Sequence, residues 1–169
     1  MKTALVTGAS SGIGKVMANS LLINEYKVFG TSRNPEHHQE DLDFELLELD
    51  VTDDESVRTC VNTFIERNKS IDILINNAGF AQVGSVEETD IAQAREQLET
   101  NFWGYVKVTQ AVLPHMRSQR SGYILNISSL AGSLGVPLQG YYSASKHAVD
   151  GFTKSLRMEV RKFGIKVVL

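Results

Sequence analysis

Short apolar runs alternate with amphipathic segments along the whole chain. The apolar runs have the length and residue types of buried strands. They are Thr3–Thr7, Lys27–Thr31, Glu45–Leu49, Ile73–Asn76, Gly122–Ile127 and Lys166–Leu169. Helical periodicity separates them, except at Asn34–Asp43, which is short and polar and predicts little helix. The alternation predicts a single α/β domain over residues 1–169, with a doubly wound parallel sheet covered by helices on both faces.

A glycine-rich turn follows the first predicted strand and precedes a helical pattern at Val16–Leu22. In this context, backbone N–H groups can approach a diphosphate, and the helix N-terminus faces it. The spacing is Gly-x-x-x-Gly-x-Gly rather than the more common Gly-x-Gly-x-x-Gly. The alternative is a purely structural turn between strand and helix. We expect a dinucleotide to be bound by Gly8, Ser10, Ser11, Gly12, Ile13 and Gly14.

Tyr142 and Lys146 are four residues apart, a spacing that puts two side chains on one helix face. The reference pKa of a tyrosine hydroxyl is about 10, so proton transfer near neutral pH requires a positive charge that stabilises the phenolate. Lys146 would supply that charge. The alternative is a pair of amphipathic residues on a solvated helix face.

Five motifs together resemble the short-chain dehydrogenase/reductase family, in the family's order and at its spacings. They are Thr7 to Gly14, Asn76-Asn77-Ala78-Gly79, Asn101, Ser128-Ser129 and Tyr142-x-x-x-Lys146. The resemblance covers residues 1–169, and the local phrasing is similar to the branch that contains hydroxysteroid and retinol dehydrogenases. It implies a Rossmann-like fold and an oxidoreductase that interconverts an alcohol and a carbonyl.

The resemblance also implies roles for the chemical residues. Tyr142 would transfer a proton to or from the substrate oxygen, and Ser129, thirteen positions earlier, would hydrogen-bond that oxygen, with Ser128 as its rival. Lys146 would lower the tyrosine pKa and bind the nicotinamide ribose. Asn101 interrupts a long helical pattern and would hold a water that extends a proton relay from the lysine. Its alternative is an ordinary polar residue in a helix.

The end of the second predicted strand bears on the choice of cofactor. An acidic residue there would accept hydrogen bonds from the adenosine ribose 2′-hydroxyl of NAD(H) and repel a 2′-phosphate. The segment Val28 to Arg33 contains no acid. Arg33 instead offers a fork of N–H donors suited to phosphate, to which Ser10 could add a hydroxyl. We therefore expect NADP(H) rather than NAD(H). The alternative is that Arg33 is a solvated loop cation.

Two further segments are assigned to the adenine side of the cofactor by the resemblance. Asp50 would hold the adenine amino group, with Val51 beside it, although Asp50 could instead cap a helix starting at Thr52. The second segment consists of Asn77, Ala78 and Gly79, which would pass beneath the adenine side and support the central strand.

Bulk properties narrow the function class. A chain of 169 residues with a formal net charge of −3 fits one domain and gives no reason to expect a nucleic-acid partner. Cys60, the only cysteine, reads as helix core and favours a reducing compartment, so we expect a cytoplasmic protein. No apolar run reaches the ~18 residues of a membrane span. His37 and His38 lie on a polar stretch without metal-ligand spacing, so no metal is expected.

The substrate is only broadly indicated. In the family, the pocket is bordered by segments after the fourth and fifth strands, which here are mostly apolar: Phe80, Val83, Leu134, Val136, Pro137, Leu138 and Tyr141. They favour a hydrophobic small-molecule alcohol or carbonyl, although the same residues would also suit a core. The alternative function is a catalytically silent NADP(H)-binding regulatory or interaction module.

Two expectations concern the chain as a whole. A stripe of small residues, Ala144, Ala148, Gly151 and Ser155, would let a second helix approach closely, and we expect a homo-oligomer, either a dimer or a tetramer. The alternative is close packing within one subunit. Because residues 164–169 read as a strand that has just begun, we also expect the functional protein to extend past Leu169.

Overall fold

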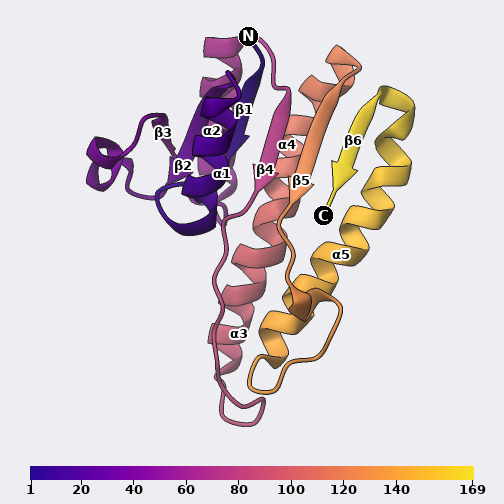
Figure 1. Ribbon diagram of the computed structural model, residues 1–169. Helices are drawn as coiled ribbons and strands as arrows, with labels where there is room; N and C mark the ends of the chain where they lie inside the picture. Colours follow the sequence, from indigo (N-terminus) through magenta and orange to yellow (C-terminus); the bar gives the residue numbers. More distant parts are fainter.

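The computed structural model describes residues 1–169, apart from the side chain of Asp41. Six parallel strands form one sheet in the order β3-β2-β1-β4-β5-β6 (Figure 1). The strands are β1 Thr3–Val6, β2 Lys27–Ser32, β3 Glu45–Glu48, β4 Ile73–Asn76, β5 Gly122–Asn126 and β6 Ile165–Val168. The predicted fold class is confirmed, and each predicted strand differs from the observed one by at most one residue at either end.

Five α-helices connect the strands, with a turn of π-helix, η3, between α3 and α4. They are α1 Gly12–Ile23, α2 Asp54–Asn68, α3 Ile91–Leu98, η3 Glu99–Trp103, α4 Gly104–Gln119 and α5 Gly140–Val160. Four short 3₁₀ turns complete the chain: η1 Pro35–His37, η2 Gln39–Asp41, η4 Leu130–Gly132 and η5 Arg161–Phe163. As expected, the polar crossover between β2 and β3 contains only such turns, η1 and η2.

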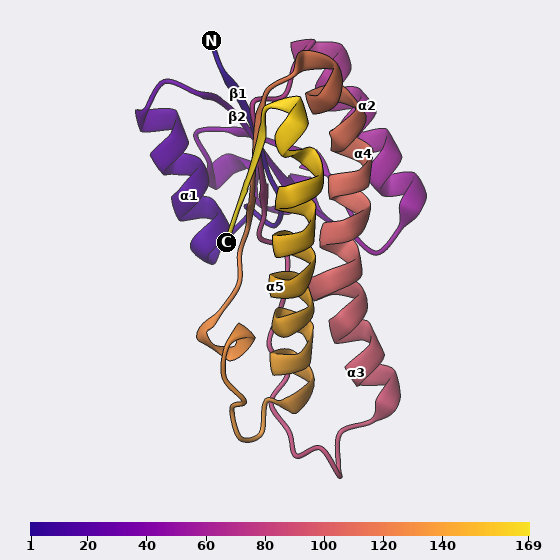
Figure 2. The ribbon, with the colours of Figure 1, turned by 90° about the vertical axis from the view of Figure 1, so that its right-hand side faces the viewer.

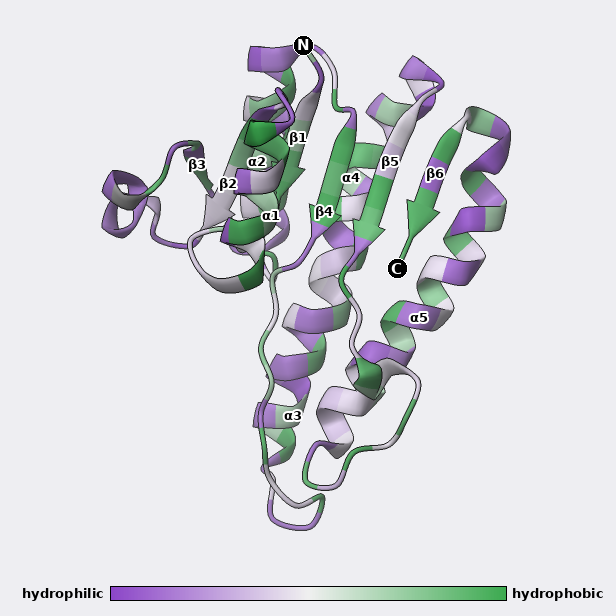
Figure 3. Cartoon of the chain, viewed as in Figure 1, coloured by the Kyte–Doolittle hydropathy of each residue, from purple (hydrophilic) through white to green (hydrophobic). Residues whose placement is uncertain are grey.

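The sheet lies between two layers of helix, with α1 on one face and α2, α4 and α5 on the other (Figure 2). Successive strand residues therefore enter different cores. Leu5 packs with Phe64 and Val108 on the face of α2 and α4, whereas Val6 packs with Ala18 on the face of α1. Burial on both faces explains why the central strands β1 and β4 are continuously apolar rather than alternating, whereas β6, at the sheet edge, alternates between buried and exposed residues. Figure 3 shows the concentration of hydrophobic residues along β4.

The strand order reverses between β1 and β4, which are neighbours in the sheet. The chain leaves β1 toward α1 on one face and leaves β4 toward α3 and α4 on the other (Figure 2). Ligands of open parallel sheets bind at such a switch point, beyond the carboxyl ends of the strands. Within the described residues, the helices are all too short or too polar to cross a membrane.

Candidate active site

A cleft of about 880 Å³ lies at the carboxyl ends of the central strands. Most residues predicted to bind a cofactor or to act in chemistry line it, although they come from five separate segments. These are Gly8, Ser10, Ser11, Gly12, Ile13, Arg33, Asp50, Val51, Asn77, Ala78, Gly79, Tyr142 and Lys146. Gly14, Asn101 and Ser129 are not among the described lining residues, whereas Ser128 is. The fold therefore brings the glycine turn and the Tyr142–Lys146 pair together.

The backbone of the glycine turn has a conformation and close contacts that residues other than glycine would disturb. Gly8 and Gly12 have φ angles of +63° and +55°, in the left-handed region that favours glycine. A Cβ on Gly12 would meet no described atom within 4 Å, so this part of the turn is open for a ligand. A Cβ on Gly14 would overlap the Gly8 carbonyl oxygen and lie 2.6 Å from the Asn77 amide nitrogen. Gly14 therefore allows α1 to start tightly against the turn.

The segment after β4 is fastened to this turn by hydrogen bonds. Thr7 Oγ1 accepts from the backbone N–H groups of Asn77 and Ala78, at 2.9 and 3.0 Å. Asn77 Nδ2 donates to the carbonyl oxygens of Thr7 and Gly8, at 3.0 and 2.9 Å. Together these bonds hold the two loops at the switch point in one fixed arrangement.

Asp50 and Arg33 lie on the side of the cleft formed by β2 and β3. Burial pushes the pKa of Asp50 upward, but hydrogen bonds from Thr52 and the charges of Arg33 and Lys107 lower it overall. The Thr52 N–H and hydroxyl both donate to Asp50 Oδ1, at 2.9 and 2.7 Å. The alternative that Asp50 caps a helix from Thr52 is wrong, because α2 begins at Asp54 and its cap is Asp53, which accepts from Ser56 N at 2.6 Å.

Lys146 is buried, with 4 % of its surface exposed, so the solvated-face alternative for the Tyr142–Lys146 pair is wrong for the lysine. Its Nζ lies 5.9 Å from the centroid of the Tyr142 ring and donates to the Ile127 carbonyl at 2.8 Å. Burial lowers the pKa of Lys146 to about 8, against the opposing influence of the Asp150 carboxylate. A modest change in this environment therefore changes the charge of the lysine near physiological pH.

The two adjacent serines have different hydrogen-bond partners. Ser128 Oγ donates to Asp150 Oδ1 at 2.6 Å, whereas Ser129 Oγ accepts from Ala131 N at 3.2 Å as the cap of η4. A hydroxyl has one proton to donate. The Ser128 proton is therefore engaged by a carboxylate, while the bond made by Ser129 leaves its proton available.

Asn101 lies at the centre of the π-helical turn η3 and is fully buried. Its Nδ2 donates to the Phe80 carbonyl at 2.8 Å and its Oδ1 accepts from Phe80 N at 2.9 Å. It is thus not an ordinary polar residue of a helix, since it pairs with the backbone of the segment after β4. Single π turns inside α-helices occur frequently at functional sites.

Some lining residues were not predicted from the sequence. Thr31, His38 and Thr52 line the cleft, and so do Glu96 and Thr100. His38 belongs to a segment whose polar composition carries no periodic signal. Tyr105 was also missed. It is buried beside Lys146, and its hydrophobic neighbours Val106 and Val108 give it no local signal that separates it from helix core.

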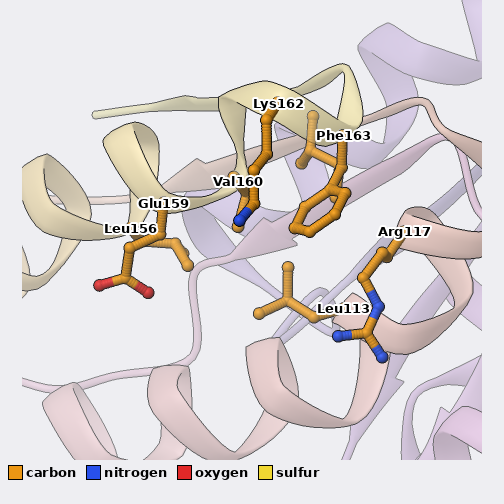
Figure 4. Close-up of a pocket in the computed structure, with 8 residues that line it drawn as sticks. Leu113, Arg117, Leu156, Glu159, Val160, Lys162 and Phe163 are labelled. Carbon is orange, nitrogen blue, oxygen red and sulfur yellow. The ribbon is translucent and has the colours of Figure 1, made fainter.

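A second hollow, of about 390 Å³, lies between the C-terminal ends of α4 and α5 (Figure 4). Its lining includes Leu113, Leu156 and Phe163, and the Glu159 carboxylate points away from the Phe163 ring. Arg117 lies 6.0 Å from the centroid of that ring. This hollow is far from the glycine turn and contains none of the predicted site residues, so the larger cleft is the candidate site. Among the described residues, no cluster of His, Cys, Asp and Glu could hold a metal ion.

The fold and the cleft define a Rossmann-like domain, with its glycine turn at the switch point of the sheet. The sequence profile described as short chain dehydrogenase matches residues 2–169. The chain therefore belongs to the short-chain dehydrogenase family, which confirms the resemblance inferred from the five motifs.

Individual relatives agree with this assignment. The chain is 46 % identical over 165 residues to a 3-ketodihydrosphingosine reductase of Bacteroides thetaiotaomicron, covering 98 % of this chain and 61 % of the relative. It is 37 % identical over 180 residues to retinol dehydrogenase 8 of Bos taurus, covering 99 % and 57 %. The second match supports the similarity to the branch that contains retinol dehydrogenases. The chain thus spans about three fifths of the length of these two relatives.

A solved structure extends the comparison to the fold. The crystal structure of a gluconate 5-dehydrogenase from Burkholderia cenocepacia in complex with NADP and tartrate is 30 % identical, with a TM-score of 0.91. The match covers 97 % of this chain and 68 % of that one. The six-stranded sheet and its helices are therefore those of a solved dehydrogenase.

Proposed function

We propose that this protein is an NADP(H)-dependent oxidoreductase that interconverts an alcohol and a carbonyl on a hydrophobic small molecule. One observation carries the proposal: the glycine turn and the Tyr142–Lys146 pair, far apart in the sequence, line the same cleft. A nucleotide held at the turn would therefore extend toward a tyrosine and a lysine suited to proton transfer. Membership of the short-chain dehydrogenase family supports this chemistry.

The cleft fits a nicotinamide dinucleotide phosphate. Ser10, Ser11 and the open Gly12 can approach a diphosphate at the start of α1, where the helix dipole favours negative charge. Arg33 can pair with a 2′-phosphate, and the ionised Asp50 can accept from the adenine amino group. The NADP bound by the Burkholderia cenocepacia relative supports the same choice here. We therefore infer NADP(H) in preference to NAD(H).

In the proposed reaction, the bound cofactor supplies or accepts a hydride. Tyr142 gives its phenolic proton to the carbonyl oxygen during reduction and takes the proton back during oxidation. Lys146 stabilises the phenolate form through its positive charge and is available to the nicotinamide ribose. Asn101 acts through its neighbours, by fixing the backbone of Phe80, which lines the cleft, and the π turn beside the lysine helix.

Ser129 is the serine we assign to the substrate oxygen. An oxygen that gains negative charge needs a hydrogen-bond donor held ready before reaction. The Ser129 hydroxyl accepts a hydrogen bond from Ala131 N. This bond fixes the position of the hydroxyl oxygen and leaves the hydroxyl proton free to be donated to the substrate. Ser128 already donates to Asp150, so its role is to connect the loop after β5 to α5.

A hydrophobic substrate fits the walls beyond Tyr142. Four residues that could have been core are instead solvent-accessible: Phe80, Val83, Leu134 and Leu138. Their two segments meet in a short parallel bridge between Gly84 and Gln139. Phe80 also lines the cleft, and exposed apolar side chains beside a cleft are typical of a ligand site. The substrate in the name of the 3-ketodihydrosphingosine reductase supports a hydrophobic ketone as the class.

The same proposal includes a homo-oligomer. On α5, Ala144, Gly151 and Ser155 face outward, and a Cβ on Gly151 would meet no described atom within 4 Å. Trp103, 47 % exposed, lies beside Phe102, which makes an edge contact with Phe152 of α5. An open small-residue stripe next to exposed aromatic rings suits a second copy of the same surface. Light scattering of the protein, with Gly151→Arg as the disrupting variant, tests this.

We also propose a cytoplasmic location. Cys60 is buried and free, and burial raises the pKa of its thiol to about 12, so it needs no oxidising environment. Fractionation of cells that contain the full protein, with a secreted enzyme as reference, checks the location.

The central experiment measures cofactor and chemistry separately. Fluorescence titration with NADPH and with NADH gives the two affinities, and NADPH consumption is then followed with a panel of long-chain ketones, steroid ketones and retinal. We expect tighter binding of NADPH and turnover of at least one hydrophobic carbonyl. Binding without turnover across the panel would favour a silent nucleotide-binding module. Equal affinity for both cofactors would contradict the NADP(H) assignment.

A further inference from the structure

A second tyrosine lies against Lys146 on the side away from the open cleft. Tyr105 projects from the first turn of α4, one helical turn after Asn101, and only 1 % of its surface is exposed. Its hydroxyl donates to the Ile127 carbonyl at 3.2 Å, the same carbonyl that accepts from Lys146 Nζ at 2.8 Å. Residues of α4, α5 and the segment after β5 therefore meet at one oxygen atom.

The contact between Tyr105 and Lys146 is direct. Lys146 Nζ lies 3.5 Å from the Tyr105 hydroxyl oxygen and 5.2 Å from the centroid of its ring. A cation within about 6 Å of an aromatic centroid is attracted by the negative face of the ring. The hydroxyl oxygen, whose proton is directed to Ile127, presents its lone pairs to the lysine.

We propose that Tyr105 is a positioning residue for Lys146: it keeps the buried amine in its charged form and holds it at the inner end of the cleft. The inference rests on the proposed function and deepens it, because Lys146 can stabilise the phenolate of Tyr142 only while the lysine is charged. Nothing in the sequence motifs marks Tyr105, which lies outside the set formed by Asn101, Ser129, Tyr142 and Lys146.

The physical need for such a partner follows from burial. An ammonium group has three N–H donors, and taking it out of water favours the neutral form unless acceptors replace the lost water. Burial is the main cause that lowers the pKa of Lys146 to about 8, and Asp150 only partly offsets it. The amine is contacted by the Ile127 carbonyl and by the hydroxyl and ring of Tyr105, while the Tyr142 ring lies farther away, at 5.9 Å from Nζ to the centroid.

Tyr105 acts as a neutral dipole rather than as a charge. Burial raises the pKa of its phenol well above the ordinary value, and proximity to Tyr142 adds to this. Among the described residues, the titratable groups around Lys146 are Tyr142 and Asp150 on its own helix and Tyr105 on α4. Tyr142 lines the cleft, whereas Tyr105 does not. Tyr142 can therefore reach a substrate, and Tyr105 supports the lysine.

The test follows the titration of Lys146 in the full chain, without cofactor or substrate. Lysine residues are labelled with ¹³C, the Cε resonance of Lys146 is assigned by its loss in Lys146→Arg, and its midpoint is read from a pH series. We expect Tyr105→Phe to lower the midpoint by roughly half a pH unit, the size expected for one long hydrogen bond from the ammonium to the hydroxyl oxygen. Tyr105→Met, which also lacks the ring, should lower it further.

The controls separate this effect from a general disturbance. Tyr123 and Lys166 form a similar pair on the surface, with 3.1 Å between Nζ and hydroxyl and 5.1 Å from Nζ to the ring centroid. Tyr123→Phe should leave the Lys146 midpoint unchanged. An unchanged or raised midpoint in either Tyr105 variant would overturn the proposal, because a residue that only fills space has no reason to favour the charged lysine.

A kinetic readout links the titration to the proposed reaction. If Lys146 must be charged, the alkaline limb of kcat/KM should move to lower pH in Tyr105→Phe by the same amount as the Lys146 midpoint, while KM below pH 7 is unchanged. A protein that shows the shifted titration but no turnover with any carbonyl would refute the proposed function and leave the role of Tyr105 intact. A moved kinetic limb with an unmoved lysine midpoint would refute the role of Tyr105.

Discussion

The two halves of the cleft are built in different ways. The glycine-turn half is held by backbone geometry and by short contacts among Thr7, Gly14 and Asn77, where there is no room for an added atom. The half around Lys146 is held by buried polar side chains that reach it from α4 and α5. The first half should therefore be sensitive to added volume, and the second to the loss of a single polar atom. Their separate sensitivities allow binding and chemistry to be tested apart.

The largest effect is expected at Tyr142, in the second half. Tyr142→Phe removes only the hydroxyl, so turnover should fall by ~10²–10⁴-fold, the usual contribution of a positioned proton donor. NADPH affinity should stay nearly the same, because the phenyl ring remains. Steady-state rates and cofactor titrations on the same preparation measure both quantities. Tyr123→Phe, on the exposed part of β5, serves as the matched control.

Lys146 should behave differently from Tyr142. Lys146→Ala is expected to weaken NADPH binding as well as turnover, since the lysine is assigned to both the ribose and the tyrosine. If only NADPH binding or only turnover changes, the assignment of Lys146 to both the cofactor ribose and Tyr142 is wrong.

The sequence anticipated the first half of the cleft better than the second. The glycine turn and Arg33 are local signals, because the residues that form the site are neighbours in the chain and next to an apolar strand. Tyr105 and the Ser128–Asp150 hydrogen bond join residues from different elements. Such contacts depend on how α4 and α5 pack against each other. In the sequence, a tyrosine that contacts a buried lysine has the same helical spacing as a tyrosine of the ordinary core, so the pattern of apolar residues does not distinguish the two.

The fold itself was predictable because the central strands β1 and β4 are buried on both faces and therefore have continuous apolar runs. Strand ends were less certain by one residue, since the chain leaves the sheet gradually at turns such as Thr7. The π turn at Asn101 was foreseen only as an interruption of a helical pattern. Its form depends on the paired hydrogen bonds between Asn101 and the Phe80 backbone, which no local spacing reveals.

A further prediction concerns the cost of the buried charge at Lys146. Its folded pKa of about 8 is below the reference value of 10.5, so folding disfavours the charged form. Between these two values the unfolded chain binds more protons than the folded one, and this group's contribution to stability rises with pH. At pH 7 the unfavourable contribution is on the order of 3 kcal/mol.

Lys146→Met should therefore stabilise the protein at pH 7 while abolishing function. The gain in unfolding free energy should shrink as the pH rises from 8 toward 10.5, because the wild-type lysine is then neutral in the folded state but still binds a proton in the unfolded state. Above 10.5 the lysine is neutral in both states, and this part of the gain should vanish. Urea unfolding at several pH values measures the difference. A gain that grows with pH would show that burial does not lower the lysine pKa.

Arg33 provides a smaller and more selective effect in the first half. Arg33→Ala should remove most of the preference for NADPH over NADH, a change of about ten- to a hundredfold for one charge-assisted pair. Turnover at saturating NADPH should change little. Arg58→Ala removes the same charge from an exposed residue of α2 that pairs with Glu55, and it should leave the preference intact. If both variants lost the preference for NADPH over NADH, the preference would come from the positively charged residues of the protein in general rather than from a contact between Arg33 and the 2′-phosphate.

The smallest effect tests the steric account of the glycine turn. Gly14→Ala places a methyl group against the Gly8 carbonyl and the Asn77 amide, and should cost about 1–3 kcal/mol in unfolding free energy, with weaker NADPH binding. Gly151→Ala is the matched control, because its Cβ would meet no described atom within 4 Å and alanine favours a helix interior by ~0.5–1 kcal/mol. Thermal unfolding and NADPH titration of the two variants decide the matter. If Gly14→Ala is as stable as Gly151→Ala, the tight start of α1 does not shape the cofactor site.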